Sequence, residues 1–266
     1  MNTTTAMPLP DRHPFGADID AAIMAHAASD RQHEVCGVVT AAPTGRGFSY
    51  HRLVNSAADP ARHFVIHPSR LRDLPPLRAV VHSHPFGPAW PSVDDMRQSQ
   101  ADSVAWGIAV PRGTADSGLF WFGGQIKPPL EGRGYRHGVT DCYALVRDWF
   151  HERFGLRLID RPRAWEWWQA GAEDLYMAHF AESGFIRLSD DTPPRRGDVA
   201  LAAVLGPVIN HALIHVGQGL VLHHPAGRHG YDPSRLPRRE PVERWRRYIR
   251  FWARHPAVSA QMDIGA

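Results

Sequence analysis

The sequence predicts an α+β fold made of two domains in tandem. Its 266 residues suffice for two small domains. A glycine- and proline-rich segment at 123–129 divides the chain into halves with different patterns. The first half alternates helical periodicity with short apolar runs typical of strands. The second half opens with a helix, which further strand-like runs follow.

This organisation predicts five segments along the chain. Residues 1–12 are polar and are expected to be disordered. A first domain is expected over residues 13–122, a linker over 123–132 and a second domain over 133–255. Residues 256–266 are expected to form a C-terminal tail.

In the first half, a helix is predicted from Asp18 to Ser29, because apolar side chains recur on one helical face. Ser92 is a good N-cap for a second helix over Val93–Ala101. The remaining apolar runs have the composition of short strands. The predicted strands cover Cys36–Ala41, Arg46–Val54, Arg78–His84, Val104–Val110 and Leu119–Phe122.

In the second half, a helix is predicted to begin near Cys142, with Thr140 or Asp141 as its cap and Gly155 at its C-terminal end. The tryptophan-rich segment 164–168 is expected to be irregular or helical. Apolar runs then predict three antiparallel strands. These strands cover Val199–Val204, Ala212–Val216 and Leu220–His223.

Arginines crowd the C-terminal region from Arg235 to Arg254. Such a run is compatible with nucleic-acid binding. The apolar residues among the arginines favour another interpretation, an amphipathic helix with a charged outer face, and we expect no nucleic-acid partner. The apolar residues that recur at helical spacing are Val242, Trp245, Ile249 and Trp252.

Composition excludes several further classes. With 43% hydrophobic and 21% charged residues, the chain is typical of soluble globular proteins. No stretch of the sequence approaches the roughly 18–20 consecutive apolar residues that a membrane span needs, so no membrane insertion is expected. Residues 1–12 lack the apolar core of a signal peptide. Cys36 and Cys142 are the only cysteines, which excludes a disulfide framework, and we expect both to be free thiols.

A first cluster of candidate site residues surrounds a His-x-His motif. His82 and His84 are two residues apart on a predicted strand and therefore point to one face. Asp95, in the first turn of the next helix, supplies a third ligand. Two imidazoles and a carboxylate suit a Zn²⁺ ion with one position open for water. Glu34 is then a candidate general base, and Ser92 a candidate stabiliser of the oxyanion.

Parts of this pattern also have ordinary explanations. With 17 histidines, about one His-x-His pair is expected by chance. Ser92 and Asp95 also have the spacing of a helix capping box. The joint spacing, with Glu34-Val35-Cys36-Gly37 upstream, resembles the JAMM metallopeptidases over about residues 12–122. The resemblance implies an α/β sandwich in which His82, His84 and Asp95 bind zinc, Glu34 is the base and Ser92 assists. Cys36 is interpreted as a small buried residue rather than a ligand.

A second cluster of candidate residues centres on Cys142. The unpaired N–H groups at a helix N-terminus favour a thiolate, which a cysteine nucleophile needs. His211 begins a predicted strand, and His223 ends the next one. Antiparallel pairing then places the two histidines together, with His223 orienting His211. Taken alone, a cysteine at a helix start is more often an inert buried thiol.

Several short motifs in the second half resemble the NlpC-type papain-fold peptidases. They are Asp141-Cys142-Tyr143, then Pro194-Arg195-Arg196-Gly197-Asp198, then His211 through Gly219, then His223. The resemblance implies a papain-like fold, with a helix followed by an antiparallel sheet, and a catalytic triad of Cys142, His211 and His223. Tyr135 resembles a family tyrosine near the oxyanion region. His215 shares a face with His211, and His224 is expected to point away from His223.

The order of the two domains resembles a family of tail assembly proteins of tailed bacteriophages. This implies other phage tail-tip proteins as partners and a place in the host cytoplasm, then at the virion tail tip. It also implies a peptidoglycan substrate, stem peptides of the host cell wall. The zinc half is expected to cut a peptide or isopeptide bond of unknown substrate. Two alternatives stay open, a structural assembly factor with vestigial sites and a maturation protease of other tail proteins.

Overall fold

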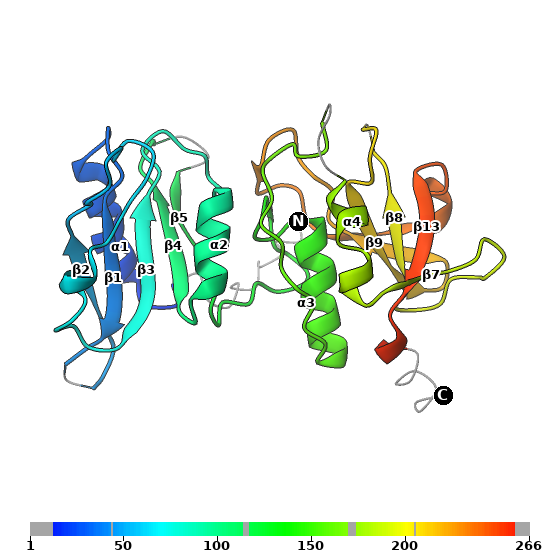
Figure 1. Cartoon of the computed structure of the whole chain (residues 1–266), viewed down its shortest axis with the longest axis horizontal. Coiled ribbons are helices and arrows are strands. Elements are labelled where there is room, and N and C mark those ends of the chain that lie inside the picture. The colour runs from blue at the N-terminus through cyan, green and yellow to red at the C-terminus, as the bar shows by residue number, and fades with distance from the viewer. Residues whose placement is uncertain (1–12, 44, 114–116, 170–173, 205, 259–266) are drawn as a thin grey trace, which may run out of the picture. The chain divides into compact units, whose positions relative to one another are not determined.

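The computed structural model describes residues 13–43, 45–113, 117–169, 174–204 and 206–258. The segment 1–12, expected to be disordered, and residues 259–266 of the expected tail lie outside the described residues. The chain forms two compact units that divide between Pro129 and Leu130, inside the predicted linker. The structure therefore has the predicted α+β class with two units (Figure 1).

The first unit is a five-stranded sheet in the order β2-β1-β3-β4-β5. All neighbouring strands are antiparallel except β3 and β4, which run parallel and are joined through helix α2. The elements of this unit are α1 (Ala17–Ser29), β1 (Cys36–Ala41), β2 (Phe48–Leu53), a 3₁₀ turn (Pro68–Arg70), β3 (Leu77–Ser83), α2 (Val93–Ala101), β4 (Ala105–Val110) and β5 (Gly118–Phe122).

The two helices of this unit cover opposite faces of its sheet. Ile23 and Ala27 of α1 join a core with Ala79, Val81 and Trp121 on one face. The other face carries His82 and Trp106. The C-cap of α2, Asp102, accepts a hydrogen bond from Trp106 Nε1 at 3.2 Å, so α2 lies on this second face. The resulting three-layer α/β/α arrangement is the sandwich that the sequence predicts.

The second unit is a helix packed on a six-stranded antiparallel sheet in the order β12-β10-β9-β8-β13-β7, beside a two-stranded ribbon of β11 and β6. Its elements are β6 (Tyr135–Arg136), α3 (Cys142–Phe154), α4 (Leu175–Ala178), a 3₁₀ turn (Ala181–Ser183), β7 (Ile186–Arg187), β8 (Val199–Ala202), β9 (His211–Gly217), β10 (Leu220–His223), β11 (Tyr231–Asp232), β12 (Arg238–Pro241), a 3₁₀ turn (Val242–Arg244) and β13 (Ile249–Arg254).

Helix α3 buries its apolar side against one face of this sheet. Leu145, Trp149 and Phe150 share a core with Ile214 of β9 and Phe251 of β13. Burying such side chains contributes roughly 1.5–3 kcal/mol each, and this helix therefore holds a fixed place on the sheet. The Asp141 carboxylate caps its N-terminus and Gly155, in the left-handed region, ends it. The start of α3 is thereby fixed at Cys142.

The predicted C-terminal helix around Trp245 is wrong. The segment folds as a 3₁₀ turn, Val242–Arg244, followed by strand β13. β13 pairs with β8, so its backbone hydrogen bonds come from the sheet rather than from a helix. The apolar residues recur at helical spacing because turn and strand together cover the second face of the sheet, where they pack on Ala200 and Leu213. Tertiary pairing here overrides a local pattern.

The ends of the predicted segments also differ in detail. Leu130, placed in the linker by the sequence, is buried in the core of the second unit. Val258, placed in the tail, is buried in the same core, so this unit continues past residue 255. Within the predicted segment 164–168, residues 165–168 form turns and residue 164 is irregular. None of the described helices is both long and apolar enough to cross a membrane.

Candidate active sites

Three predicted metal ligands meet on the α2 face of the first sheet. His82 Nε2 lies 3.1 Å from His84 Nε2 and 3.2 Å from Asp95 Oδ1, and His84 Nε2 lies 3.5 Å from Asp95 Oδ2. Ligand atoms about 2.0–2.1 Å from a tetrahedral zinc ion lie about 3.3 Å apart. The three donors are therefore spaced as such an ion requires, and all three side chains are buried.

The protein fixes these donors through contacts of its own. His84 Nδ1 lies 2.8 Å from the carbonyl oxygen of Pro88, which can only accept. Its proton therefore sits on Nδ1, and Nε2 turns a lone pair toward His82 and Asp95. A carbonyl that holds the second nitrogen of a histidine in this way is the usual support of a metal ligand. The donor set and this tautomer fit zinc.

Asp95 is held by a capping box at the start of α2. Its Oδ2 accepts the backbone N–H of Ser92 at 2.8 Å, and Ser92 Oγ accepts the backbone N–H of Asp95 at 3.1 Å. The spacing of Ser92 and Asp95 is therefore that of a helix capping box, but the cap does not prevent Asp95 from binding a metal. Asp95 Oδ1 still faces His82, and the Ser92 hydroxyl hydrogen is not used in the cap.

Glu34 lies just before β1 and interacts electrostatically with His84 and Asp95. Ser83 ties this segment to β3, since its Oγ accepts the Val35 N–H at 2.9 Å and its N–H donates to the Val35 carbonyl at 2.9 Å. Burial raises the pKa of Glu34 to about 7; His84 lowers it and Asp95 raises it further. A carboxyl group with a pKa in this range is suited to proton transfer near neutral pH.

Cys36 follows Glu34 by two residues, is fully buried and is unsuited to a role in the metal-ligand cluster. Its Sγ faces the carbonyl of Leu53 at 3.8 Å. Burial, followed by the charge of Glu34, raises the pKa of the Cys36 thiol to about 11. It is a small core residue, as the sequence predicts.

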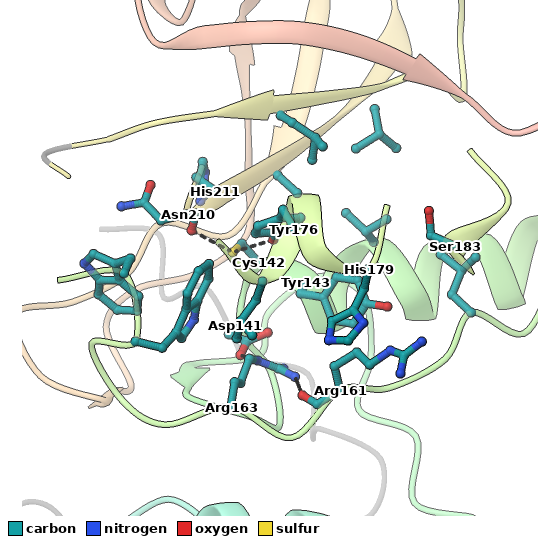
Figure 2. Close-up of a pocket in the computed structure, with 18 of the residues that line it drawn as sticks. Asp141, Cys142, Tyr143, Arg161, Arg163, Tyr176, His179, Ser183, Asn210 and His211 are labelled. Atoms are coloured by element: carbon teal, nitrogen blue, oxygen red, sulfur yellow. Dashed lines mark hydrogen bonds and ion pairs between the residues drawn. The ribbon is translucent and has the colours of Figure 1, made fainter. Parts of the chain in front are cut away.

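The second cluster lies where α3 begins and β9 begins. Cys142 is the first residue of α3, and its Sγ lies 3.9 Å from the carbonyl oxygen of Asn210 and 3.7 Å from the hydroxyl of Tyr176. Both partners point toward the sulfur in Figure 2, with His211 beside them. Cys142 and His211 line one cavity of about 360 Å³, whose wall is mainly apolar and aromatic. A thiol and an imidazole thus line one partly enclosed space of the kind in which ligands bind.

Both carboxylate oxygens of Asp141, the residue before the candidate nucleophile Cys142, accept hydrogen bonds. Its Oδ1 accepts the Ala144 N–H at 2.9 Å, and its Oδ2 accepts the Gly138 N–H at 2.8 Å. Arg163 contacts the same Oδ2 through Nε at 2.8 Å and Nη2 at 2.7 Å. Burial opposes the ionised form, but Arg163 and then His137 hold the pKa of Asp141 well below its ordinary value. The helix carrying Cys142 therefore rests on a buried ion pair.

The protonation of Cys142 differs from the sequence-based expectation. Burial raises the pKa of the thiol to about 11, and the charge of Asp141 adds to this. Burial, and then His224, lowers the pKa of His211 to about 4. The resting pair is therefore a neutral thiol and a neutral imidazole, not a preformed thiolate. Such a pair needs the histidine to act as a general base during attack.

His211 and His223 lie together as predicted. His211 Nε2 is 3.1 Å from His223 Nδ1, and the other nitrogen of His223, Nε2, is 3.2 Å from Glu240 Oε2. Trp245 stacks on His211 with ring centroids 5.2 Å apart. Because Nε2 of His211 faces His223, its Nδ1 is the nitrogen that remains for Cys142.

The other candidates in this half occupy different places. His215 packs edge-on against Trp252, away from the cavity of Cys142. His224 Nε2 lies 2.9 Å from the carbonyl oxygen of Arg235, and its ring packs edge-on against Tyr135. Tyr135 lines the cavity with Cys142. Burial raises the pKa of Tyr135 well above its ordinary value, so its hydroxyl stays protonated and can donate.

Sequence reasoning missed three residues that contact this cluster. They are Tyr176 beside the sulfur, Arg163 on Asp141, and Glu240 behind His223. The sequence offers a signal for Glu240 alone, because it is one of few acidic residues among the C-terminal arginines. Tyr176 and Arg163 lie in segments without clear periodicity, and nothing in the sequence marks them.

The fold and the two clusters define a two-domain protein of the peptidase-like class. Residues 17–122 match the family of prokaryotic homologs of the JAB domain, and residues 120–249 match the NlpC/P60 family. These matches confirm the two resemblances predicted from the motifs.

The chain belongs to the family of tail tip assembly protein K. It is 34% identical to tail tip assembly protein K of Escherichia phage N15 over 221 residues, which are 81% of this chain and 86% of that protein. It is 36% identical to tail tip assembly protein K of Escherichia phage lambda over 190 residues, 70% of this chain and 86% of that one.

Solved structures with similarity include the NlpC/p60 domain of peptidoglycan hydrolase SagA, at 16% identity and a TM-score of 0.28 over 46% of this chain and 87% of that one. An NlpC/P60 family protein from Bacillus cereus has 10% identity and a TM-score of 0.31, over 87% of this chain and 66% of that one. Similarities this weak support no conclusion about the function of this chain.

Proposed function

We propose that the second unit is a cysteine peptidase that hydrolyses stem peptides of bacterial peptidoglycan. The observation that carries the proposal is the cavity shared by Cys142 and His211, with His223 bonded behind the imidazole. The substrate class rests on membership of the NlpC/P60 family. The walls of the cavity are mainly apolar and aromatic, with few polar groups beside the thiol and the imidazole.

In the proposed reaction, His211 Nδ1 takes the thiol proton as Cys142 Sγ attacks the peptide carbonyl. The C–N bond then breaks, the leaving amine takes that proton from His211, and the acyl group stays on sulfur as a thioester. His211 next removes a proton from water, which attacks the thioester; the C–S bond breaks and His211 returns the proton to the sulfur. The products are a carboxylic acid and the restored Cys142 thiol.

We further propose that the first unit is a zinc-dependent peptidase or isopeptidase. His82, His84 and Asp95 would hold the ion. Zinc in a site with three protein ligands supplies Lewis-acid activation of water and of the scissile carbonyl. Glu34 accepts and returns the proton, a role suited to its raised pKa. The Ser92 hydroxyl, held by its cap, donates toward the developing oxyanion.

Family membership supports a place for this chain in phage tail assembly. The relatives carry the name tail tip assembly protein, which favours other tail-tip proteins as partners. We propose that the chain assembles in the host cytoplasm, reaches the tail tip of the virion and acts there on the wall of the next host. A wall hydrolase at the tail tip would open a local path for the tail.

The decisive experiment is release of soluble muropeptides from purified peptidoglycan. We expect release by the wild type and by Cys36→Ala, and a loss of at least about 1000-fold in Cys142→Ala, because no other group supplies the nucleophile. Cys36→Ala is the matched control, since that cysteine is buried in the other unit. Equal release by the wild type and Cys142→Ala would refute the proposed peptidase.

The two alternatives predict different results in the phage. Plaque formation by a Cys142→Ala, His82→Ala double variant would support a structural assembly factor. Uncut tail proteins in particles made with Glu34→Gln, detected by mass spectrometry, would instead identify a maturation protease.

A further inference from the structure

A line of three polar side chains crosses the edge of the second sheet. Val221 of β10 lies opposite His215 of β9 and opposite Glu240 of β12. His223 follows Val221 by two residues on β10, so it lies opposite Arg238 rather than Glu240. His211 and Glu240 are therefore diagonal neighbours of His223, one on each adjacent strand. Diagonal neighbours on one face are within reach of long side chains.

The contacts along this line are continuous. His211 Nε2 lies 3.1 Å from His223 Nδ1, and His223 Nε2 lies 3.2 Å from Glu240 Oε2. His223 is fully buried, so water does not compete for either of its nitrogens. Each nitrogen of this ring thus has one protein partner.

The chemistry of the last member sets the direction of every bond. A carboxylate only accepts, so His223 must carry its proton on Nε2. Its Nδ1 is then a lone pair, which accepts the proton that His211 carries on Nε2. Nδ1 of His211 is left as a lone pair. This is the nitrogen that must take the proton of Cys142.

Both rings must be neutral for this pattern of bonds, and their surroundings keep them so. Burial, then His211 and Arg238, lowers the pKa of His223 to about 2. The pKa of His211 is lowered to about 4, first by burial. The charged and titratable groups that face His223 are His211 on β9, His224 beside it, and Arg238 and Glu240 on β12.

Glu240 is itself held in place. Trp245 Nε1 donates to the same Oε2 at 2.8 Å, while its ring stacks on His211. Arg238 Nε and Arg244 Nη1 lie 3.6 and 3.7 Å from Oε1. The oxygen that faces His223 is therefore fixed as an acceptor.

We propose that Glu240 is a positioning residue that fixes the tautomers of His223 and His211, so that His211 presents an unprotonated Nδ1 to Cys142. The proposal rests on the proposed cysteine peptidase. Without Glu240, His223 is free to carry its proton on Nδ1. His211 Nε2 would then be an acceptor, its proton would move to Nδ1, and the base would be lost.

The tautomers can be measured without any substrate. Long-range ¹H–¹⁵N NMR of the full chain labelled in histidine distinguishes N–H from lone-pair nitrogens. His211→Asn and His223→Asn spectra assign the two rings among the 17 histidines. We expect both rings to be protonated on Nε2 in the wild type. A wild-type His223 protonated on Nδ1 would overturn the proposal, whatever the activity of the protein.

Two substitutions separate positioning from mere structure. Glu240→Leu removes the acceptor, and we expect mixed tautomers at His223 and a fall in kcat of about 10- to 100-fold with KM little changed. Glu240→Gln keeps a carbonyl that Trp245 can orient, and we expect the wild-type tautomers and a kcat above that of the Leu variant. Glu243→Leu is the control, because that acid is exposed and pairs with Arg246.

The outcomes are distinguishable from failure of the proposed function. If the wild type releases no peptide, the peptidase proposal fails, while the NMR spectra still decide the role of Glu240. Unchanged tautomers in a folded Glu240→Leu protein, or equal spectra and equal kcat for the Leu and Gln variants, would count against positioning. If the Leu variant does not fold, the wild-type and Gln spectra remain decisive, since either must show His223 protonated on Nε2.

Discussion

Arg163→Met is expected to destabilise the second unit strongly, because it breaks a buried ion pair. The guanidinium contacts Asp141 Oδ2 at 2.7 and 2.8 Å and Asp160 Oδ1 at 3.1 Å. Asp141 is only 3% exposed, so its carboxylate would lose its main counter-charge without gaining water. Removing one partner of such a pair costs about 3–5 kcal/mol. The two backbone N–H bonds to Asp141 remain, which places our expectation near the lower end.

Native-state hydrogen exchange in the intact chain measures this loss. The amides of α3 report the free energy of opening of the unit that carries them, independently of the first unit. Arg246→Met is the matched control, because its pair with Glu243 is exposed and is expected to contribute less than about 1 kcal/mol. A loss below about 1 kcal/mol in Arg163→Met would refute the claim that the buried ion pair of Arg163 and Asp141 stabilises α3.

The same pair predicts a dependence on pH. The pKa of Asp141 is lower in the folded state than in the unfolded chain, so its contribution is fully present above the unfolded value of about 3.9. It is lost as the pH falls through the folded value. In Arg163→Met this acid-dependent part of the stability should shrink. Identical acid unfolding curves for both proteins would contradict this role of the pair.

Other sites give three further predictions. His84→Ala should lower the zinc content of the purified chain from about one ion to near zero by elemental analysis, while the exposed His67→Ala keeps it; equal contents would exclude the proposed site. Alkylation of Cys142 by iodoacetamide should accelerate with pH toward its pKa of about 11 rather than level off below 8.5, because the ionised thiolate is the reactive form; a plateau near pH 7 would show a preformed thiolate. Gly37→Ala should destabilise the first unit by roughly 1–3 kcal/mol in denaturant unfolding, since a Cβ there would lie 2.5 Å from the His51 carbonyl oxygen; an unchanged midpoint would show that β2 yields easily.

The elements best predicted from the sequence are those with local causes. Strand Cys36–Ala41 and helix Val93–Ala101 have the predicted bounds, the first from an apolar run and the second from a capping pattern. Cys142 begins α3 because Asp141 caps it. The structure also brings together His82, His84 and Asp95, since strand alternation and helix capping suffice to align them.

What escaped prediction depends on contacts between distant segments. Glu240 meets His223 only through the register of β12 on β10, which no local pattern encodes. Trp245 was assigned to a helix because spacing alone does not distinguish a helix from a turn followed by a strand. The pKa of Cys142 was expected to fall because the helix end is visible in sequence, whereas the burial that raises it arises from packing.

The capping box of α2 has a consequence for the metal site proposed in the first unit. Asp95 and His84 are held by the Ser92 N–H and the Pro88 carbonyl, which are contacts within the protein. The ligands are thus organised by the fold itself, in contrast to zinc fingers, whose folding depends on the metal. We therefore expect zinc to bind at the proposed site without refolding of the first unit.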